Sequence, residues 1–166
     1  MISTSEIKMD KDLKNKQIVV KVHFNAKPDA VWQAWTTKAI LDKWWAPKPW
    51  RAETEKLDFK EGGSWLYAMV GPKNERHYAN FLYRKIDDRK SFEGEDAFTD
   101  ENGSINKSEP QTYWKCEFKA AGTGTDVKIT LTPKTEGALE KNLDMGFEEG
   151  FKSGLGNLEE YFEGGK

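Results

Sequence analysis

Alternation of apolar and polar residues predicts a series of β-strands through most of the chain. From Ile18 to Phe24 the apolar side chains stand at every second position, as in a half-buried strand. Short turns follow and favour antiparallel hairpins. Six further strands are predicted, at Trp50–Phe59, Ser64–Val70, His77–Ile86, Ser91–Thr99, Thr112–Ala120 and Thr125–Pro133. Alternate positions of the last two are polar, so one side of the sheet is expected to face water.

A repeat of three or four residues predicts helices in two other parts of the chain. Two short helices are expected between Phe24 and Trp50, the first over Val31–Trp35 and the second from Thr37 until Pro47 ends it. Near the C-terminus a long amphipathic helix is predicted from Glu140 to Phe162. Its apolar positions are Leu139, Leu143, Phe147, Phe151, Leu155, Leu158 and Phe162. At 1.5 Å per residue this helix measures about 34 Å, enough to cross the sheet.

Three glycines recur at every fourth position of this helix, Gly146, Gly150 and Gly154. Each lowers helix stability by up to about 1 kcal/mol relative to alanine, so the repeat needs a reason. One interpretation is a close approach of the helix to the sheet or to bulky rings. The other is that the glycines leave space for a ligand, which a substitution at Gly150 would fill.

Several motifs resemble one branch of a known superfamily. The segments 26–36 (AKPDAVWQAWT), 41–47 (LDKWWAP), 59–65 (FKEGGSW) and 69–72 (MVGP) are similar to signatures of the bacterial SRPBCC proteins. That branch is named for its similarity to the activator of the heat-shock chaperone ATPase (AHSA-like). The resemblance implies a single α+β domain over 18–163 with the helix-grip fold of START-like and birch-pollen-allergen-like proteins. In that fold a seven-stranded antiparallel sheet wraps a long C-terminal helix, with two short helices after strand 1.

Proteins of this superfamily often hold small apolar or aromatic molecules between sheet and helix. The resemblance therefore implies a hydrophobic cavity as the ligand site, with Met145 as a further filler. The expected ligand-binding residues are Trp44, Trp65, Tyr67, Met69, Phe81, Tyr83, Phe98, Trp114, Phe118, Phe147, Gly150 and Phe151. The alternative is that the same rings only fill the core.

Composition limits the remaining classes of function. The 166 residues fit one domain, and seven Trp, five Tyr and nine Phe indicate a core built from rings. A net charge of -2 argues against nucleic acid as a partner. No stretch of about 18 apolar residues predicts a membrane span, and the polar segment 1–17, expected to be a flexible arm, lacks the features of a signal peptide. A cytoplasmic protein without metal or cofactor is expected, since only Cys116, His23 and His77 offer soft ligands.

Polar residues on neighbouring strands offer candidate acid–base chemistry. The candidates are His77, Arg76, Glu95, Asp96, Arg84 and Tyr83. Consecutive strand residues point to opposite faces, so at most one of Glu95 and Asp96 enters the space beside the helix. The inward carboxyl would have a raised pKa unless a cation pairs with it. His77 and His23 are expected outside, and Cys116 is expected to be a buried, inert thiol.

Three hypotheses of function follow. The first is binding of a hydrophobic or aromatic small molecule in an apolar cavity. The second is a chaperone-associated protein of the stress response. It would be supported by an exposed apolar patch around Trp44, Trp45, Pro47 and Trp50. A weak homodimer is a related alternative. The polar arm of 17 residues cannot replace the chaperone-engaging domain of eukaryotic relatives. The third is a cofactor-free cyclase or hydrolase that uses an inward carboxyl or His77.

Overall fold

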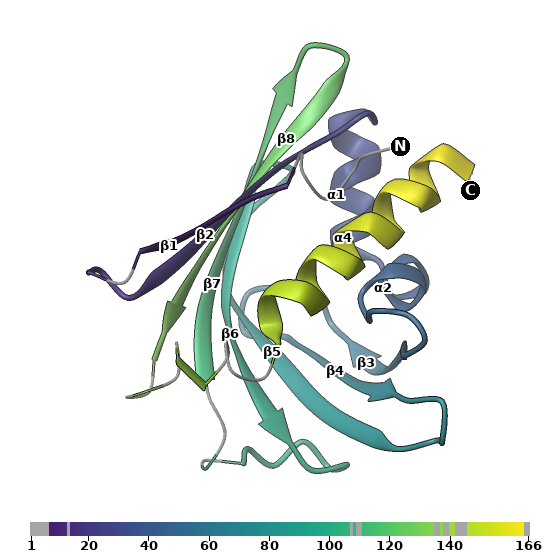
Figure 1. Cartoon of the computed structure of the whole chain (residues 1–166), viewed down its shortest axis with the longest axis vertical. Helices are drawn as coiled ribbons and strands as arrows, with labels where there is room; N and C mark the ends of the chain where they lie inside the picture. Colours follow the sequence, from purple (N-terminus) through teal and green to yellow (C-terminus); the bar gives the residue numbers. More distant parts are fainter. Residues whose placement is uncertain are drawn as a thin grey trace.

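One antiparallel sheet forms the framework of the protein (Figure 1). The computed structural model describes residues 7–12, 14–106, 108, 111–134, 137, 140–141 and 146–164. Across these residues the strand order is β1-β2-β8-β7-β6-β5-β4-β3. The strands are β1 (Lys8–Asp12), β2 (Gln17–Phe24), β3 (Arg51–Leu57), β4 (Ser64–Val70), β5 (Arg76–Asp87), β6 (Ser91–Thr99), β7 (Gln111–Ala121) and β8 (Gly124–Pro133). The helices are α1 (Pro28–Thr36), α2 (Lys38–Trp44) and α4 (Phe147–Gly164).

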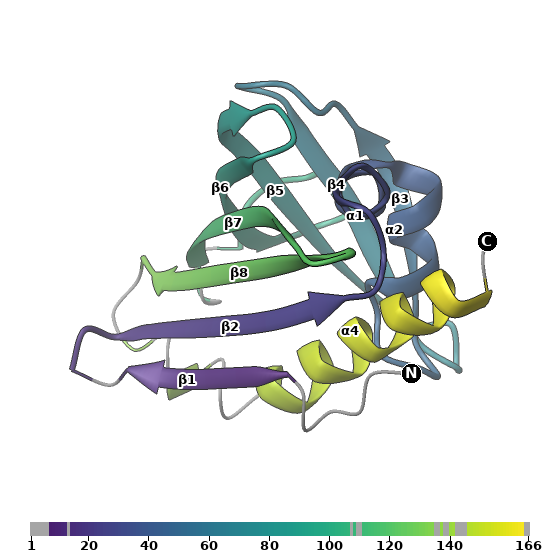
Figure 2. The same ribbon diagram turned by 90° about the horizontal axis from the view of Figure 1, so that it is seen from above.

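The sheet curves around α4, which crosses its concave side (Figures 1 and 2). The short helix α2 packs against both α4 and β3. This arrangement confirms the predicted α+β class and the helix-grip fold. All seven predicted strands are present.

The eighth strand, β1, lies in the segment expected to be a flexible arm. It pairs antiparallel with β2, with Met9 opposite Val20. Its sequence is mostly charged because it is an edge strand, where charged side chains face water and discourage pairing with other chains. The Nζ of Lys11 lies 2.9 Å from Oε1 of Glu148, which joins this edge to the first turn of α4. The strand count is therefore eight among the described residues.

The long helix begins later than predicted, at Phe147 and not at Glu140. Gly146 has a φ of 82°, in the left-handed region that interrupts a regular α-helix and favours glycine. The predicted positions Leu139, Leu143 and Met145 lie outside the described residues. The apolar face that follows is buried against the sheet, and its residues are Phe151, Leu155 and Leu158.

The repeated glycines of α4 have different surroundings. A Cβ at Gly154 would lie 3.1 Å from the carbonyl oxygen of Trp45 and 3.3 Å from that of Trp44, closer than ordinary contact. A Cβ at Gly150 would meet only Cγ of Pro47, at 3.8 Å. Gly154 therefore allows the backbones of α4 and of the end of α2 to approach each other. Gly150 has ordinary room for a methyl group.

A polar contact fixes α2 on β3 at the edge of the aromatic core. Oδ1 of Asp42 accepts hydrogen bonds from the backbone N–H of Thr54, at 2.9 Å, and from its hydroxyl, at 2.6 Å. The indole N–H of Trp65 donates to the same hydroxyl oxygen at 2.9 Å. This series of hydrogen bonds orients the Trp65 ring, which stacks on Tyr67 with ring centroids 4.2 Å apart.

Candidate functional site

Rings fill almost all of the space between sheet and helix. A pocket between sheet and helix in the described part of the chain has a volume of about 10 Å³, enough for one water molecule at most. Its lining residues are Trp35, Leu41, Trp45, Trp65, Phe81, Tyr83, Phe92, Trp114 and Cys116. In this conformation the pocket is too small for a drug-sized ligand, which needs several hundred Å³.

Three of the expected ligand-binding residues belong to the packed core. Trp44 is fully buried, and its indole N–H donates to the carbonyl oxygen of Ala34 at 2.9 Å. Tyr83 is 1% exposed. Phe118 packs its ring edge-on against Trp32, with centroids 5.2 Å apart, at the end of the sheet next to α1. Each of these side chains therefore packs within the core and offers no surface to a ligand.

The other expected residues lie nearer the start of α4. Trp65, Tyr67, Phe81, Trp114 and Phe151 are buried on the concave face. Three more keep partial contact with solvent, namely Met69, Phe98 and Phe147. Gly150 faces Pro47 from α4. The concave face is thus more open at this end than at the end beside α1.

Asp96 stands on this part of the concave face. In the sheet register it lies opposite Phe81 of β5 and Thr112 of β7, and it alternates with Phe98 along β6. The preceding residue, Glu95, points to the other face. The sequence left open which carboxyl is inward, and the register assigns Asp96 to the inward side.

The Asp96 carboxyl is deep in the protein, although the residue as a whole is only half-buried. Burial raises its pKa from 3.8 to about 7, against the opposing effect of hydrogen bonds from Trp114 and the backbone of Thr112. The indole Nε1 of Trp114 donates to Oδ2 over 2.9 Å. Within the described ranges no Lys, Arg or His forms an ion pair with Asp96. Near pH 7 both protonation states of this carboxyl are therefore populated.

Two further polar groups lie beside Asp96. Burial raises the pKa of the Tyr67 hydroxyl, and the negative charge of Asp96 raises it further, while Trp45 opposes the shift. The indole N–H of Trp45 is buried close to the Tyr67 hydroxyl, but no described residue accepts a hydrogen bond of ordinary length and angle from it. The rings of Trp45 and Tyr67 are 6.3 Å apart, and Trp45 lies 5.7 Å from Trp114. We call Asp96, Tyr67, Trp45, Trp114 and Thr112 the Asp96 site.

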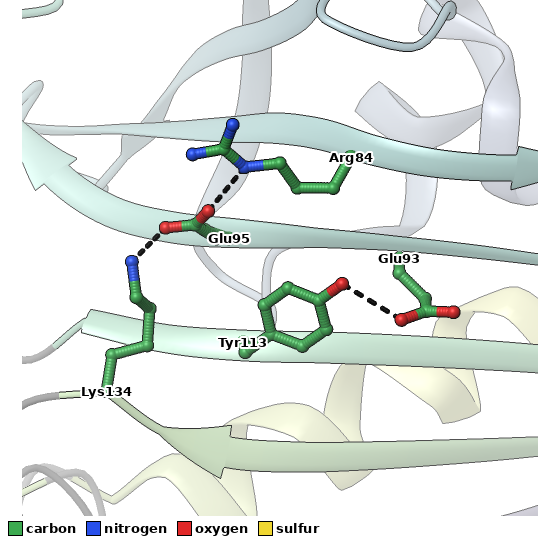
Figure 3. A network of polar contacts seen from close by, with 5 residues as sticks. All are labelled: Arg84, Glu93, Glu95, Tyr113 and Lys134. Carbon is green, nitrogen blue, oxygen red and sulfur yellow. Dashed lines mark hydrogen bonds and ion pairs between the residues drawn. The ribbon is translucent and has the colours of Figure 1, made fainter.

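Glu95 shows the opposite environment on the outer face of the sheet (Figure 3). Its carboxylate pairs with both Lys134 and Arg84, which hold its pKa below the ordinary value against a smaller effect of burial. Next to it the hydroxyl of Tyr113 donates to Glu93 at 2.9 Å. This network is typical of a solvated strand face, on which neighbouring side chains of opposite charge compensate each carboxylate.

The remaining predicted acid–base groups are not brought to Asp96. His77 is exposed, and its ring lies tilted against that of Trp50, with centroids 5.5 Å apart. Arg76 pairs with Glu53 at 3.1 Å. His77 lies outside, as expected, and does not converge with Asp96, because His77 and Arg76 form the exposed start of β5.

Sequence reasoning missed Trp45 as a residue of the concave face and chose its neighbour Trp44. Trp45 follows the last residue of α2 and contacts the rings of Trp65, Tyr67, Trp114 and Phe151. A periodic pattern alone does not resolve two consecutive tryptophans at a helix end. The signal for Asp96 was present, since it shares the alternation of Phe92 and Phe98 along β6.

A family model described as activator of Hsp90 ATPase homolog 1-like protein matches residues 25–163. The chain belongs to this family. A crystal structure of a protein from Mycobacterium smegmatis is 27% identical, with a TM-score of 0.85 over 92% of this chain and 94% of that one. A solution structure from Arthrobacter aurescens is 26% identical, with a TM-score of 0.87 over 93% and 90% of the two chains.

A third similar structure, from Staphylococcus epidermidis, is 28% identical, with a TM-score of 0.79 over 91% of this chain and 92% of that one. Comparison with curated proteins gives no match. None of the helices described here is long and apolar enough to cross a membrane.

Proposed function

We propose that this member of the family is a cytoplasmic protein that binds a small apolar or aromatic molecule at the Asp96 site. The apolar body would lie against the partly exposed rings of Phe98 and Phe147, beside Met69. A polar group of the molecule would meet the carboxyl of Asp96. The single observation that carries this proposal is an inward carboxyl on a face built largely from aromatic and other apolar side chains.

The energetics of burial support a role for Asp96 outside folding. A carboxyl taken out of water without a cationic partner destabilises a protein, whereas an apolar residue of similar size at this position would not. Two N–H donors offset only part of this loss. The neighbouring rings, which include Phe81 and Trp114, would form an apolar surface even if the carboxyl of Asp96 were absent. A ligand that satisfies the carboxyl explains why this sequence carries one here.

The pKa of Asp96 favours a second candidate function, cofactor-free acid–base catalysis. A group with a pKa of about 7 can both donate and accept a proton at neutral pH. In a cyclase or hydrolase Asp96 would transfer the proton, and the indole N–H of Trp45 would stabilise negative charge on a substrate oxygen. This function needs the same ligand site and is tested after binding.

The chaperone-associated alternative has less support from the described surface. Trp44 is fully buried and Trp45 turns toward the sheet, so these two residues do not form the apolar patch expected of it. Among the described large apolar side chains, Ile105 is the exposed one. The family description alone favours this alternative.

Native mass spectrometry of freshly purified protein, combined with fluorescence of the uncharged dye Nile red, tests the binding proposal. The wild type is compared with Asp96→Asn and with the matched control Glu95→Gln, which changes the adjacent carboxyl on the outer face. We expect a co-purified molecule in the wild type and in Glu95→Gln, and weaker retention of it in Asp96→Asn. The uncharged dye, which has no hydrogen to donate to a carboxylate, should bind the apolar surface of all three proteins. Equal retention of the co-purified molecule by all three proteins, or no bound molecule and no dye binding in any, would contradict the proposal.

A further inference from the structure

We propose that the ligand of the Asp96 site is an organic cation, a small ammonium compound with an aromatic or apolar body. This inference rests on the proposed function and specifies the chemical class of its ligand. Three features of the described residues support it: the charge balance at Asp96, the rings around it, and the contrast with Glu95.

The charge balance comes first. The contacts of Asp96 are N–H donors, the indole of Trp114 at 2.9 Å and the backbone of Thr112. They orient the carboxylate but add no positive charge. The ionisable group that faces it from β4 is Tyr67, whose raised pKa keeps it neutral. The elements on either side present Phe81 from β5 and Trp114 from β7. The negative charge is therefore left without a counterion by the described part of the fold.

The surrounding rings give the same preference. The faces of aromatic rings carry partial negative charge, so they attract a cation and repel an anion. Trp45 and Tyr67 stand 6.3 Å apart, and Trp114 lies 5.7 Å from Trp45. An ammonium group at the Asp96 carboxylate would lie close to Tyr67 and Trp114. Carboxylate and rings would both stabilise it, as in known sites for ammonium ligands.

Glu95 shows how this chain compensates a carboxylate when no ligand is involved. One residue away and on the opposite face, it pairs with both Arg84 and Lys134. Asp96 is more buried than Glu95, so a neighbouring positive charge would stabilise its carboxylate more strongly. None of the described residues supplies one. We infer that the cation comes from the ligand.

Ligands of other charge fit less well. An anion would bring a second negative charge to an uncompensated carboxylate. A neutral alcohol could donate one hydrogen bond, but charge-assisted hydrogen bonds are roughly twice as strong as neutral ones. A cation should therefore bind more tightly than a neutral molecule with the same apolar body.

The test compares three probes with a common ring: 2-phenylethylamine, which is cationic, 2-phenylethanol, which is neutral, and phenylacetate, which is anionic. Their binding is measured by amide chemical shifts of ¹⁵N-labelled protein at pH 8, where Asp96 is ionised and the amine is protonated. We expect the amine to bind at least about tenfold more tightly than the alcohol, and the acetate most weakly. Shifts should centre on β6, β7 and the first turn of α4.

Two variants assign the preference to the carboxyl. Asp96→Asn should remove most of the difference between amine and alcohol, and Glu95→Gln should leave it unchanged. The amide spectrum of each variant shows that it is folded, and the comparison in the wild type stands without any variant. If the wild type bound the alcohol as tightly as the amine, the proposed cationic ligand would be wrong, but the proposed function would stand. A preference that survives Asp96→Asn would also overturn it, and shifts from none of the probes would speak against both.

Discussion

The indole N–H of Trp114 donates a hydrogen bond to Oδ2 of Asp96 over 2.9 Å, from the neighbouring strand of the same concave face. Tryptophan offers a donor without charge, so this contact fixes the carboxyl while leaving its negative charge uncompensated. Burial outweighs this hydrogen bond and raises the pKa of the carboxyl to about 7. Stability and the proposed ligand binding therefore have opposite requirements at this position.

The first prediction concerns the pH dependence of stability. The folded state raises the pKa of Asp96 from 3.8 to about 7, so between these values the folded protein holds a proton that the unfolded chain releases. The contribution of Asp96 to the free energy of unfolding should fall as pH rises from about 4 to about 7, and stay constant above.

Asp96→Asn should remove this loss. At pH 8 we expect its free energy of unfolding to exceed that of the wild type by about 1–3 kcal/mol, less than the full shift implies because solvent reaches the site. Near pH 4 the two proteins should differ little. Urea unfolding at both pH values measures this, and Glu95→Gln serves as the control. A variant less stable than the wild type at pH 8 would show that the carboxylate is compensated.

The second prediction concerns the glycines of α4. Gly150→Ala should stabilise the protein by up to about 1 kcal/mol, because alanine favours the helix and its Cβ meets only Pro47 at 3.8 Å. Gly154→Ala should destabilise it by about 1–3 kcal/mol, because the Cβ would press on the Trp45 carbonyl oxygen at 3.1 Å. That segment cannot move freely, since Asn157 donates a hydrogen bond to the carbonyl oxygen of Ala46 at 3.0 Å.

Thermal unfolding of the two alanine variants gives the answer directly. Because both substitutions place the same residue in the same helix, their difference reports the local packing and not helix propensity. Equal melting temperatures would mean that the end of α2 yields to the added methyl group. In that case the close approach at Gly154 would not explain the glycine.

The third prediction concerns the contact that joins α2 to β3. Asp42→Ala removes two hydrogen bonds to Thr54 and should lower the free energy of unfolding by about 1–3 kcal/mol. Asp58→Ala is the control, since among the described residues this exposed carboxylate has a 3.5 Å ion pair with Lys60 and should change stability by about 0.5 kcal/mol or less. Chemical denaturation compares them. Similar values for both would mean that Thr54 finds other partners when Asp42 is lost.

The fourth prediction concerns the single thiol. Cys116 is 1% exposed, and burial raises its pKa, so the reactive thiolate is scarce in the folded protein. An aromatic disulfide reagent at pH 8 should label it only at the rate of unfolding, and denaturant should speed labelling by orders of magnitude. Labelling within seconds in native buffer would mean that the concave face opens readily.

Alternation and periodicity predicted most of this fold because each strand buries one face on a common aromatic core. β1 was missed since Lys8–Asp12 lies at the sheet edge, where pairing depends on the backbone of β2 and not on its own apolar residues. The start of α4 was missed because the apolar periodicity of the sequence continues through Gly146. The positive φ of Gly146, which the sequence pattern does not show, interrupts the regular helix there. Local pattern reports burial, and it does not report backbone conformation.

The candidate site was less predictable for a related reason. Alternation separates Glu95 from Asp96, but their neighbours across the sheet decide which one is compensated. The cations Arg84 and Lys134 come from β5 and from the residue after β8, far apart in the sequence. Likewise, the enclosed volume of about 10 Å³ depends on how many rings meet, which no single segment reveals.

The pairing of β2 with β8 has a consequence for how the protein is made. Val20 lies opposite Ile129, so the second strand gains its inner neighbour only after more than a hundred further residues have been added. At 5–20 residues per second this delay lasts roughly 5–20 s. Helix α4, which covers the rings, emerges later still. The nascent chain thus exposes an aromatic surface that the finished protein hides, and long-range pairings of this kind fold slowly. Aggregation during synthesis is therefore the main hazard for this sequence.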